Sequence, residues 1–266
     1  MSTITTDQGI VHYEVYGRGQ PVILLHGWLG SWALWQDTMT HLGKSFRTYA
    51  LDFWGFGESG TRRNSYRVSD FVSLLNQFME NLGITSAPLV GHSMGGTISL
   101  LAATQFPERV KKVAVIGSPL VGTSLSIPLK MAGNRMVARQ LFQSMSVFRL
   151  GMRLYAPMIC RDKRFVEMID QDLTRTTLEA FLTSIFTLRN TDLRMAMRGV
   201  KIPVMGMYGA NDRIVNPKQW QVLQEYIPHT QIEWFSNAGH FIMLDEPALY
   251  LEKIFEFLDE KRELAL

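Results

Sequence analysis

The sequence predicts an α/β protein with a mostly parallel, doubly wound sheet and a helical segment inserted after the sixth strand. Short, continuous apolar runs alternate with longer segments of helical character, which is the pattern of buried parallel strands wrapped by helices. This alternation stops for roughly 80 residues and then resumes. One domain split by an insertion accounts for both observations.

The first half of the chain supplies most of the expected strands. Residues 10–16 alternate partly and follow the turn sequence Asp7-Gln8-Gly9, so they are expected to form the second strand of a hairpin. Buried strands are expected at 22–26, 48–51, 88–90 and 113–116. Helices are expected between them at 33–42, 68–82 and 97–106.

The second half predicts the insertion and the end of the sheet. Residues 119–200 lack a strong strand and have helical character, so we expect a core of 1–118 and 201–266 and a helical cap of 119–200. Many of the chain's methionines fall in this segment, where they fill the core of a small subdomain or line an adaptable apolar pocket. The later elements are expected at 203–208, 217–226, 231–235 and 247–261.

Composition excludes several classes of protein. No apolar run approaches the roughly 18 residues that a membrane-spanning helix needs. The N-terminal residues lack a basic stretch followed by an apolar one, and Cys160 is the single cysteine, so a reducing, cytoplasmic location is expected. The net charge is +3, but residues 119–200 alone hold 12 basic and 6 acidic residues. Without a nucleic-acid motif, this excess predicts a basic solvated surface rather than a phosphate-binding face.

Ser93 is the candidate nucleophile. Residues 91–95 read Gly-His-Ser-Met-Gly between an apolar strand and a helix, which is the context that a strained nucleophile elbow requires. Such a turn exposes the serine hydroxyl, and the start of the following helix favours a developing oxyanion. A plain tight turn is the alternative interpretation of these letters.

A serine hydroxyl needs a base, and the base needs an orienting carboxylate. His240 follows the last expected strand, and Asp212 follows the strand before it, so both lie in loops at the same edge of a parallel sheet. His92 directly precedes Ser93 in an extended segment, so its side chain is expected to point away. Asp52 is interpreted as a turn residue, and Asp245 as a cap of the closing helix.

In this order and spacing, the motifs resemble those of the α/β-hydrolase superfamily over nearly the whole chain. The resemblance rests on His26-Gly27-Trp28, Asp52-x-x-Gly55-x-Gly57-x-Ser59, residues 91–96, Gly209-x-x-Asp212 and Gly239-His240. It implies an insertion at the cap position and a triad of Ser93, Asp212 and His240. It also implies that the backbone N–H groups of Trp28 and Met94 form an oxyanion hole. The side chains of Trp28 and Phe241 are expected to line the substrate pocket.

A dinucleotide site is the main competing signal, because residues 55–60 match Gly-x-Gly-x-x-Gly after a strand. No helix opens directly after the last glycine; instead residues 61–65 read as a polar loop. The acidic residue expected about 20 positions later falls near Glu80, on a helix rather than at the end of a strand. The chain also lacks a Walker lysine motif and a zinc-binding histidine pair, so we expect no cofactor and no metal.

The default activity for this pattern is hydrolysis of a small, apolar carboxylic ester. A serine at position 93 argues against dehalogenases and epoxide hydrolases, which resemble this pattern but carry aspartate there. Carbon–carbon bond hydrolases often have a Gly/Ser-rich oxyanion loop, which residues 26–31 match in part. Perhydrolases or haloperoxidases of the same fold, and ligand receptors that retain the triad, would also show these motifs.

Overall fold

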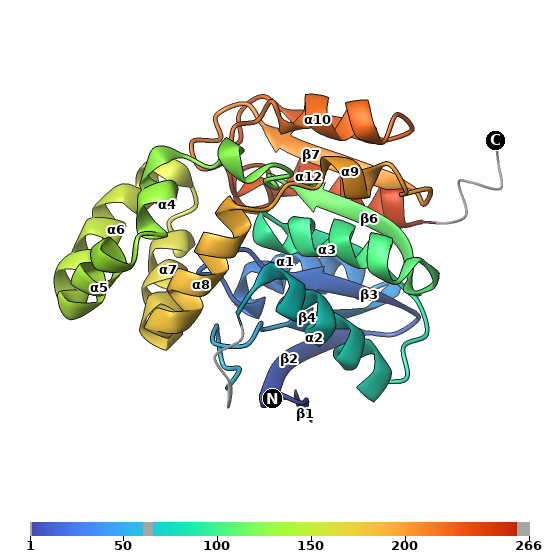
Figure 1. Cartoon of the computed structure of the whole chain (residues 1–266). Helices are drawn as coiled ribbons and strands as arrows, with labels where there is room; N and C mark the ends of the chain where they lie inside the picture. Colours follow the sequence, from blue (N-terminus) through green and yellow to red (C-terminus); the bar gives the residue numbers. More distant parts are fainter. Residues whose placement is uncertain (1, 61–65, 260–266) are drawn as a thin grey trace.

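The computed structural model describes residues 2–60 and 66–259 (Figure 1). In this part of the chain, eight strands form one sheet in the order β1-β2-β4-β3-β5-β6-β7-β8. The strands are β1 (Ser2–Thr5), β2 (Ile10–Gly17), β3 (Gln20–Leu25), β4 (Phe46–Leu51), β5 (Ala87–His92), β6 (Val110–Ile116), β7 (Val204–Gly209) and β8 (Gln231–Phe235). The polar loop expected at 61–65 lies outside the described residues.

The sheet is mostly parallel, which confirms the predicted fold class. β1 pairs antiparallel with β2, and β2 pairs antiparallel with β4, whereas all other neighbours run parallel. Every residue of β5 and β7 is buried, as expected for continuous apolar strands covered on both faces. The hairpin of β1 and β2 is also as predicted.

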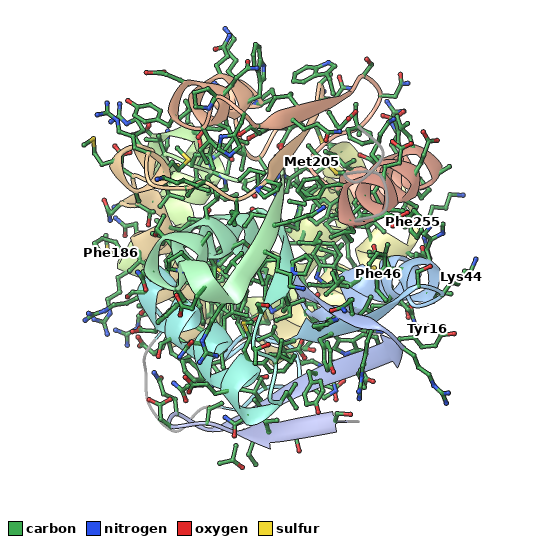
Figure 2. The ribbon with its side chains drawn as sticks, turned by 90° about the vertical axis from the view of Figure 1, so that its right-hand side faces the viewer. Tyr16, Lys44, Phe46, Phe186, Met205 and Phe255 are labelled. Atoms are coloured by element: carbon green, nitrogen blue, oxygen red, sulfur yellow. The ribbon has the colours of Figure 1, made fainter. Side chains whose placement is uncertain are left out.

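Helices cover both faces of the sheet. On one face α2 packs on α3, and α3 packs on β5 and β6, while α1 contacts β4 and α12 on the other (Figure 1). Phe46 of β4 and Phe255 of α12 lie side by side, with ring centroids 5.9 Å apart (Figure 2). The helices of this core are α1 (Gln36–Leu42), α2 (Val68–Asn81), α3 (Met94–Gln105), α10 (Gln219–Tyr226), α11 (Ile242–Asp245) and α12 (Pro247–Leu258).

A group of helices between β6 and β7 stands to one side of the sheet (Figure 1). We call α4–α8 the helical insertion. Its members are α4 (Ile127–Ala132), α5 (Arg135–Gln143), α6 (Met145–Ile159), α7 (Arg164–Arg175) and α8 (Leu178–Arg189). No helix in the described residues is both long enough and apolar enough to cross a membrane.

The predicted segment 119–200 extends beyond this insertion. It also contains α9 (Arg194–Met197), which contacts α3 and α10 and therefore packs on the core. The side chains of Leu193 and Met197 are buried there. A short bridge between Val121 and Asp192 brings the two connections of the insertion side by side.

Candidate active site

Ser93 lies between the end of β5 and the start of α3, in a strained backbone conformation. Its φ is +51° and its ψ is −117°, a region that costs a residue other than glycine about 1–3 kcal/mol. The Ser93 N–H donates to the carbonyl of Ile116 on β6 at 2.8 Å, which fixes the turn to the sheet. The strand, the turn and the helix therefore occur as the sequence predicts.

The close approach of β5, α3 and β3 requires a residue without a side chain at position 95. A Cβ atom on Gly95 would lie 2.1 Å from the carbonyl oxygen of Leu25 on β3. Main-chain atoms cannot move aside as a flexible side chain can, so a larger residue would displace the helix from the sheet. The glycine thus sets the position of the first turn of α3 behind Ser93.

His240 and Asp212 meet at the carboxyl edge of the sheet. The His240 Nδ1–H donates to Asp212 Oδ2 at 2.8 Å, and both side chains are almost fully buried. The other carboxylate oxygen, Oδ1, accepts the N–H groups of Ile214 at 2.8 Å and Val215 at 2.9 Å. These two bonds fix the carboxylate, and the carboxylate leaves the lone pair of the neutral imidazole on Nε2.

Gly117, at the end of β6, forms the floor under this pair. Its φ is +54°, and a Cβ atom there would lie 3.2 Å from His240 Nδ1 and 3.3 Å from Asp212 Oδ2. Both the left-handed conformation and the tight contact favour glycine. The backbone of β6 can therefore approach the imidazole and the carboxylate closely.

Trp28 and Met94 each present a free backbone N–H. Neither group donates to an acceptor in the parts of the chain that the structure describes. Trp28 lies in a turn closed by the bond from the Gly30 N–H to the Gly27 carbonyl at 3.1 Å, and Leu29 within it has a φ of +56°. Met94 is the first residue of α3, where N–H groups have no partner within the helix.

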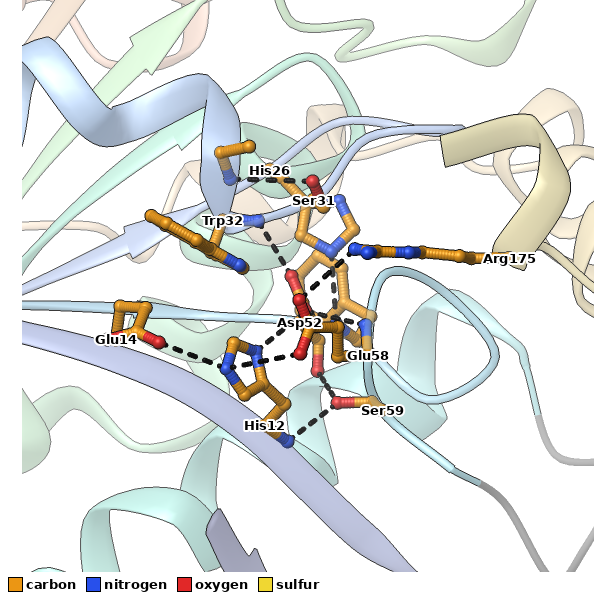
Figure 3. A network of polar contacts seen from close by, with 11 residues as sticks. His12, Glu14, His26, Ser31, Trp32, Asp52, Glu58, Ser59 and Arg175 are labelled. Carbon is orange, nitrogen blue, oxygen red and sulfur yellow. Dashed lines mark hydrogen bonds and ion pairs between the residues drawn. The ribbon is translucent and has the colours of Figure 1, made fainter. Parts of the chain in front are cut away.

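His26 and Asp52 hold the loop that carries Trp28. His26 is fully buried, and burial lowers its pKa. This neutral ring donates from Nδ1 to the Gly27 carbonyl at 2.7 Å and accepts the Phe53 N–H on Nε2 at 3.0 Å. Asp52 accepts the N–H groups of Trp32 and Glu58 at 2.7 and 2.8 Å (Figure 3). Residues 55–60 thus form a turn around the Asp52 carboxylate, which agrees with the interpretation of Asp52 as a turn residue.

His12 does not take the half-exposed position that is usual for a residue on a hairpin strand. It is buried, and its Nδ1 lies 3.0 Å from Asp52 Oδ2 (Figure 3). Burial opposes the charged imidazolium, but the hydrogen bond and charge of Asp52, helped by Glu58 and Glu14, outweigh it and raise the pKa of His12. Glu58 also pairs with Arg175 of α7 at 3.2 Å, which ties the helical insertion to this network.

Comparison with known proteins identifies the family of this fold. The family model described as "alpha/beta hydrolase fold" matches residues 20–155, which is half of the chain. The chain belongs to this family. A pimeloyl-[acyl-carrier protein] methyl ester esterase of Aliivibrio fischeri is 25% identical to this hydrolase over 94% of the chain and 98% of its own length.

Solved structures share the hydrolase fold at low sequence identity. An esterase from Exiguobacterium antarcticum has a TM-score of 0.84 at 21% identity, covering 97% of this chain and 98% of its own. The enol-lactonase from Burkholderia xenovorans also has a TM-score of 0.84, at 20% identity, covering 97% and 99%.

A cavity of about 240 Å³ lies between the core and the helical insertion of this hydrolase. Ser93, His240, Trp28 and Phe241 all line it, so the structure brings these predicted residues together. Met94 does not line it, because its side chain is buried in the core. The insertion supplies apolar side chains, namely Pro128, Leu129, Ala132, Leu141, Phe148, Met152, Tyr155, Ile159, Phe165, Ile169 and Phe181. None of the described lining residues is Lys, Arg, Asp or Glu.

Trp28 joins the core to the insertion across this cavity. Its indole N–H donates to the carbonyl of Phe181 on α8 at 3.2 Å, and the two rings are 4.6 Å apart. Phe241 makes a second junction, with its ring 4.3 Å from that of Phe165 on α7. Both aromatic side chains therefore form walls between the polar edge of the sheet and the apolar helices.

His92 also lines the cavity, and the prediction that it points away was wrong. Its Nε2–H donates to the His240 carbonyl at 3.0 Å, and the two rings are 4.6 Å apart. Burial, reinforced by the neighbouring His240, lowers the pKa of His92 well below its usual range, so the ring stays neutral. Alternation along a strand places neighbours on opposite sides, but the strained turn at Ser93 breaks that alternation.

Asp245 does not cap the closing helix as expected. Its Oδ2 accepts the Gly239 N–H at 2.7 Å, and its Oδ1 accepts the Arg161 N–H at 2.8 Å. The residue before Pro247 makes no side-chain cap either. Asp245 instead joins the loop of His240 to the connection between α6 and α7. No group of three or more metal-binding side chains occurs in the described residues.

Proposed function

We propose that this α/β hydrolase cleaves carboxylic esters through an acyl-enzyme, with Ser93 as nucleophile, His240 as base and Asp212 as the orienting acid. The observation that carries the proposal is the buried His240–Asp212 hydrogen bond of 2.8 Å beside a serine held at positive φ in the same cavity. The esterases among its relatives and structural neighbours support the same reaction class.

In the proposed reaction, His240 removes the proton from the Ser93 hydroxyl as Oγ attacks the ester carbonyl. The imidazole can accept this proton on Nε2, because its Nδ1–H is committed to Asp212. Asp212 stabilises the imidazolium that forms, and the two backbone N–H groups on its other oxygen hold it in place. The imidazolium then gives the proton to the departing alcohol, and water repeats the attack on the acyl-enzyme.

The negative charge that develops on the carbonyl oxygen needs fixed donors. The N–H groups of Trp28 and Met94 suit this role because both are free, and Met94 adds the positive end of the α3 dipole. His26 and Asp52 hold the turn around Trp28. Losing one such donor typically lowers kcat about 100- to 1,000-fold.

The helical insertion acts as the cap in this proposal. It covers the reacting groups with apolar side chains, and its cavity offers no charged partner for an acidic substrate. Trp28 and Phe241 would hold the acyl group between the cap and Ser93. The substrate class that fits is a small ester with an uncharged hydrocarbon acyl chain.

Hydrolysis of p-nitrophenyl esters by Ser93→Ala tests the proposal. We expect kcat to fall by at least about 10⁴-fold, because the nucleophile is lost while binding remains. Ser99→Ala is the matched control, since Ser99 is also buried on α3 but bonds only to the Gly95 carbonyl. It should keep full activity. A fluorophosphonate should label the wild type at Ser93.

Two results would contradict the proposal. The first is more than a tenth of the activity in Ser93→Ala. The second is labelling of Ser93 with only a single slow turnover, which would indicate a ligand receptor that retains these residues.

A further inference from the structure

The outward face of α6 carries an apolar stripe that nothing in the described chain covers. Val147, Leu150, Leu154 and Met158 are 70%, 58%, 72% and 57% exposed. Their spacing of three and four residues places them on one side of the helix. Contiguous apolar patches on a soluble protein usually mark a surface that binds a partner.

The inward face of the same helix is apolar as well. Phe148, Met152 and Tyr155 point to the cavity above Ser93. A helix that buries one apolar face in its own protein normally presents polar residues on the other. The outward stripe of α6 therefore has no role in the packing of this chain. Contact with an apolar partner would remove its side chains from water, which is favourable in free energy.

The charged side chains of α5 and α6 themselves are all basic, and acidic residues of α7 and α8, Asp170 and Glu179, pair with three of them. The segment 135–159, which covers α5 and α6, contains four arginines and no acidic residue. Arg149 and Arg153 share Asp170 of α7, so they retain a net positive charge. Arg139 is exposed and forms no ion pair within the described residues. The stripe therefore has a net positive charge around it. It lies at the end of the insertion farthest from the sheet (Figure 1).

A groove between α5 and α6 leads from this face towards the cavity. Val147 of the stripe lines the groove, whose other described lining residues are Gln140, Leu141, Ser144, Phe148, Gly151, Met152 and Tyr155. Four of them, Leu141, Phe148, Met152 and Tyr155, also line the cavity above Ser93. These four side chains therefore lie between the groove and the candidate site.

We propose that the α5–α6 face docks on an anionic lipid surface. The stripe lies on the protruding outer side of α6. A fluid lipid surface can adapt to this shape, so no preformed complementary groove is needed. The arginines match the negative head groups of such a surface. Docking would bring the groove to the lipid, so that an apolar ester could pass from the surface to the cavity. This last step rests on the proposed function, whereas docking itself does not.

Co-sedimentation of the whole chain with vesicles tests the docking. We expect binding to vesicles of phosphatidylglycerol mixed with phosphatidylcholine, weaker binding to phosphatidylcholine alone, and a decline with added salt. Leu150→Ser with Leu154→Ser should weaken binding about tenfold or more, because two exposed leucines lose their burial. The control is Phe186→Ser with Met195→Ser, two residues that are also exposed, at 49% and 71%, but lie outside α5 and α6. It should bind within about twofold of the wild type.

Arg139→Glu should weaken binding to the anionic vesicles and leave binding to the neutral ones unchanged. Hydrolysis of soluble p-nitrophenyl acetate by the stripe variant should equal that of the wild type, which shows that the fold is intact. Ser93→Ala should bind vesicles as the wild type does. Vesicle binding without ester hydrolysis would therefore contradict the proposed function alone. Ester hydrolysis without vesicle binding would contradict the docking alone.

Two kinds of result would overturn the docking proposal. One is equal vesicle binding by the stripe variant and the wild type, or no binding by either. The other is a wild type that sediments as a dimer and a stripe variant that sediments as a monomer. In that case a second copy of the chain covers the stripe.

Discussion

Replacing Asp212 with asparagine should remove most of the activity while leaving the fold intact. Two backbone N–H groups, from Ile214 and Val215, donate to Asp212 Oδ1 at 2.8 and 2.9 Å. In Asp212→Asn these donors hold the amide oxygen at that position. The NH₂ group then faces His240 Nδ1 and can only donate to it. The imidazole proton must move to Nε2, and the ring loses the lone pair that would accept the proton of Ser93.

The size of the effect follows from these contacts. Turning the amide to restore the productive imidazole would leave two buried N–H groups without an acceptor, at a cost of about 1–3 kcal/mol each. A total of about 2–6 kcal/mol corresponds to roughly 30- to 10⁴-fold, since 1.36 kcal/mol is tenfold. In serine proteases the equivalent change lowers kcat about 10⁴-fold. We therefore expect kcat to fall about 10³- to 10⁴-fold in Asp212→Asn.

The assay is steady-state hydrolysis of p-nitrophenyl butyrate, with circular dichroism to check folding. Asp192→Asn is the matched control, because Asp192 also accepts a backbone N–H, that of Arg194, but lies exposed and away from the cavity. It should keep its full rate. A loss of less than about tenfold in Asp212→Asn would refute the reasoning, since it would mean that Asp212 does not control the proton on His240.

Four further outcomes follow from the geometry. Along a series of straight-chain esters, kcat/KM should rise about fourfold per methylene and level off once the acyl chain fills the cavity of about 240 Å³. Asp245→Asn should lower both kcat and the free energy of unfolding, the latter by about 1–3 kcal/mol in denaturant titrations. Asp245 accepts one backbone N–H on each of its two carboxylate oxygens, whereas asparagine has only one accepting oxygen. Gly117→Ala should destabilise the fold by about 1–2 kcal/mol in the same titrations and reduce kcat, because its φ is +54° and the added Cβ would crowd His240. Burial raises the pKa of Cys160 to about 12, so a thiol reagent at pH 8 should modify this residue only as the protein unfolds, and rapid labelling of the native protein would contradict this.

The sequence predicts the parts of the site that depend on chain order. Ser93, Asp212 and His240 each follow a strand of a parallel sheet, and the carboxyl ends of such strands meet at one edge. Their approach to one edge of the sheet could therefore be expected from the apolar runs alone. The limits of most strands were close to the observed ones, and the strand at 231–235 agrees fully.

The sequence does not predict the contacts that depend on how loops fold back. Asp245 precedes a proline-led helix, which is a common setting for a cap, yet its carboxylate turns towards the loop of His240. His92 was misplaced because strand alternation holds only up to the elbow, where the φ of Ser93 is +51°. The burial of His12 could not be predicted either, because a hairpin strand gives no sign that Asp52, which follows the neighbouring strand β4, lies against its imidazole.

The core and the insertion contribute different kinds of groups to the cavity. The core supplies Ser93 and His240, and the Asp212 carboxylate behind His240 is held by two backbone N–H groups. The insertion contributes apolar side chains and Tyr155, and it meets the core through Trp28 and Phe241. Electrostatic catalysis needs groups that do not reorganise, whereas apolar binding tolerates side chains that repack. Under the proposed function, changes in the insertion can therefore alter which ester is bound while the proposed chemistry at Ser93 stays the same.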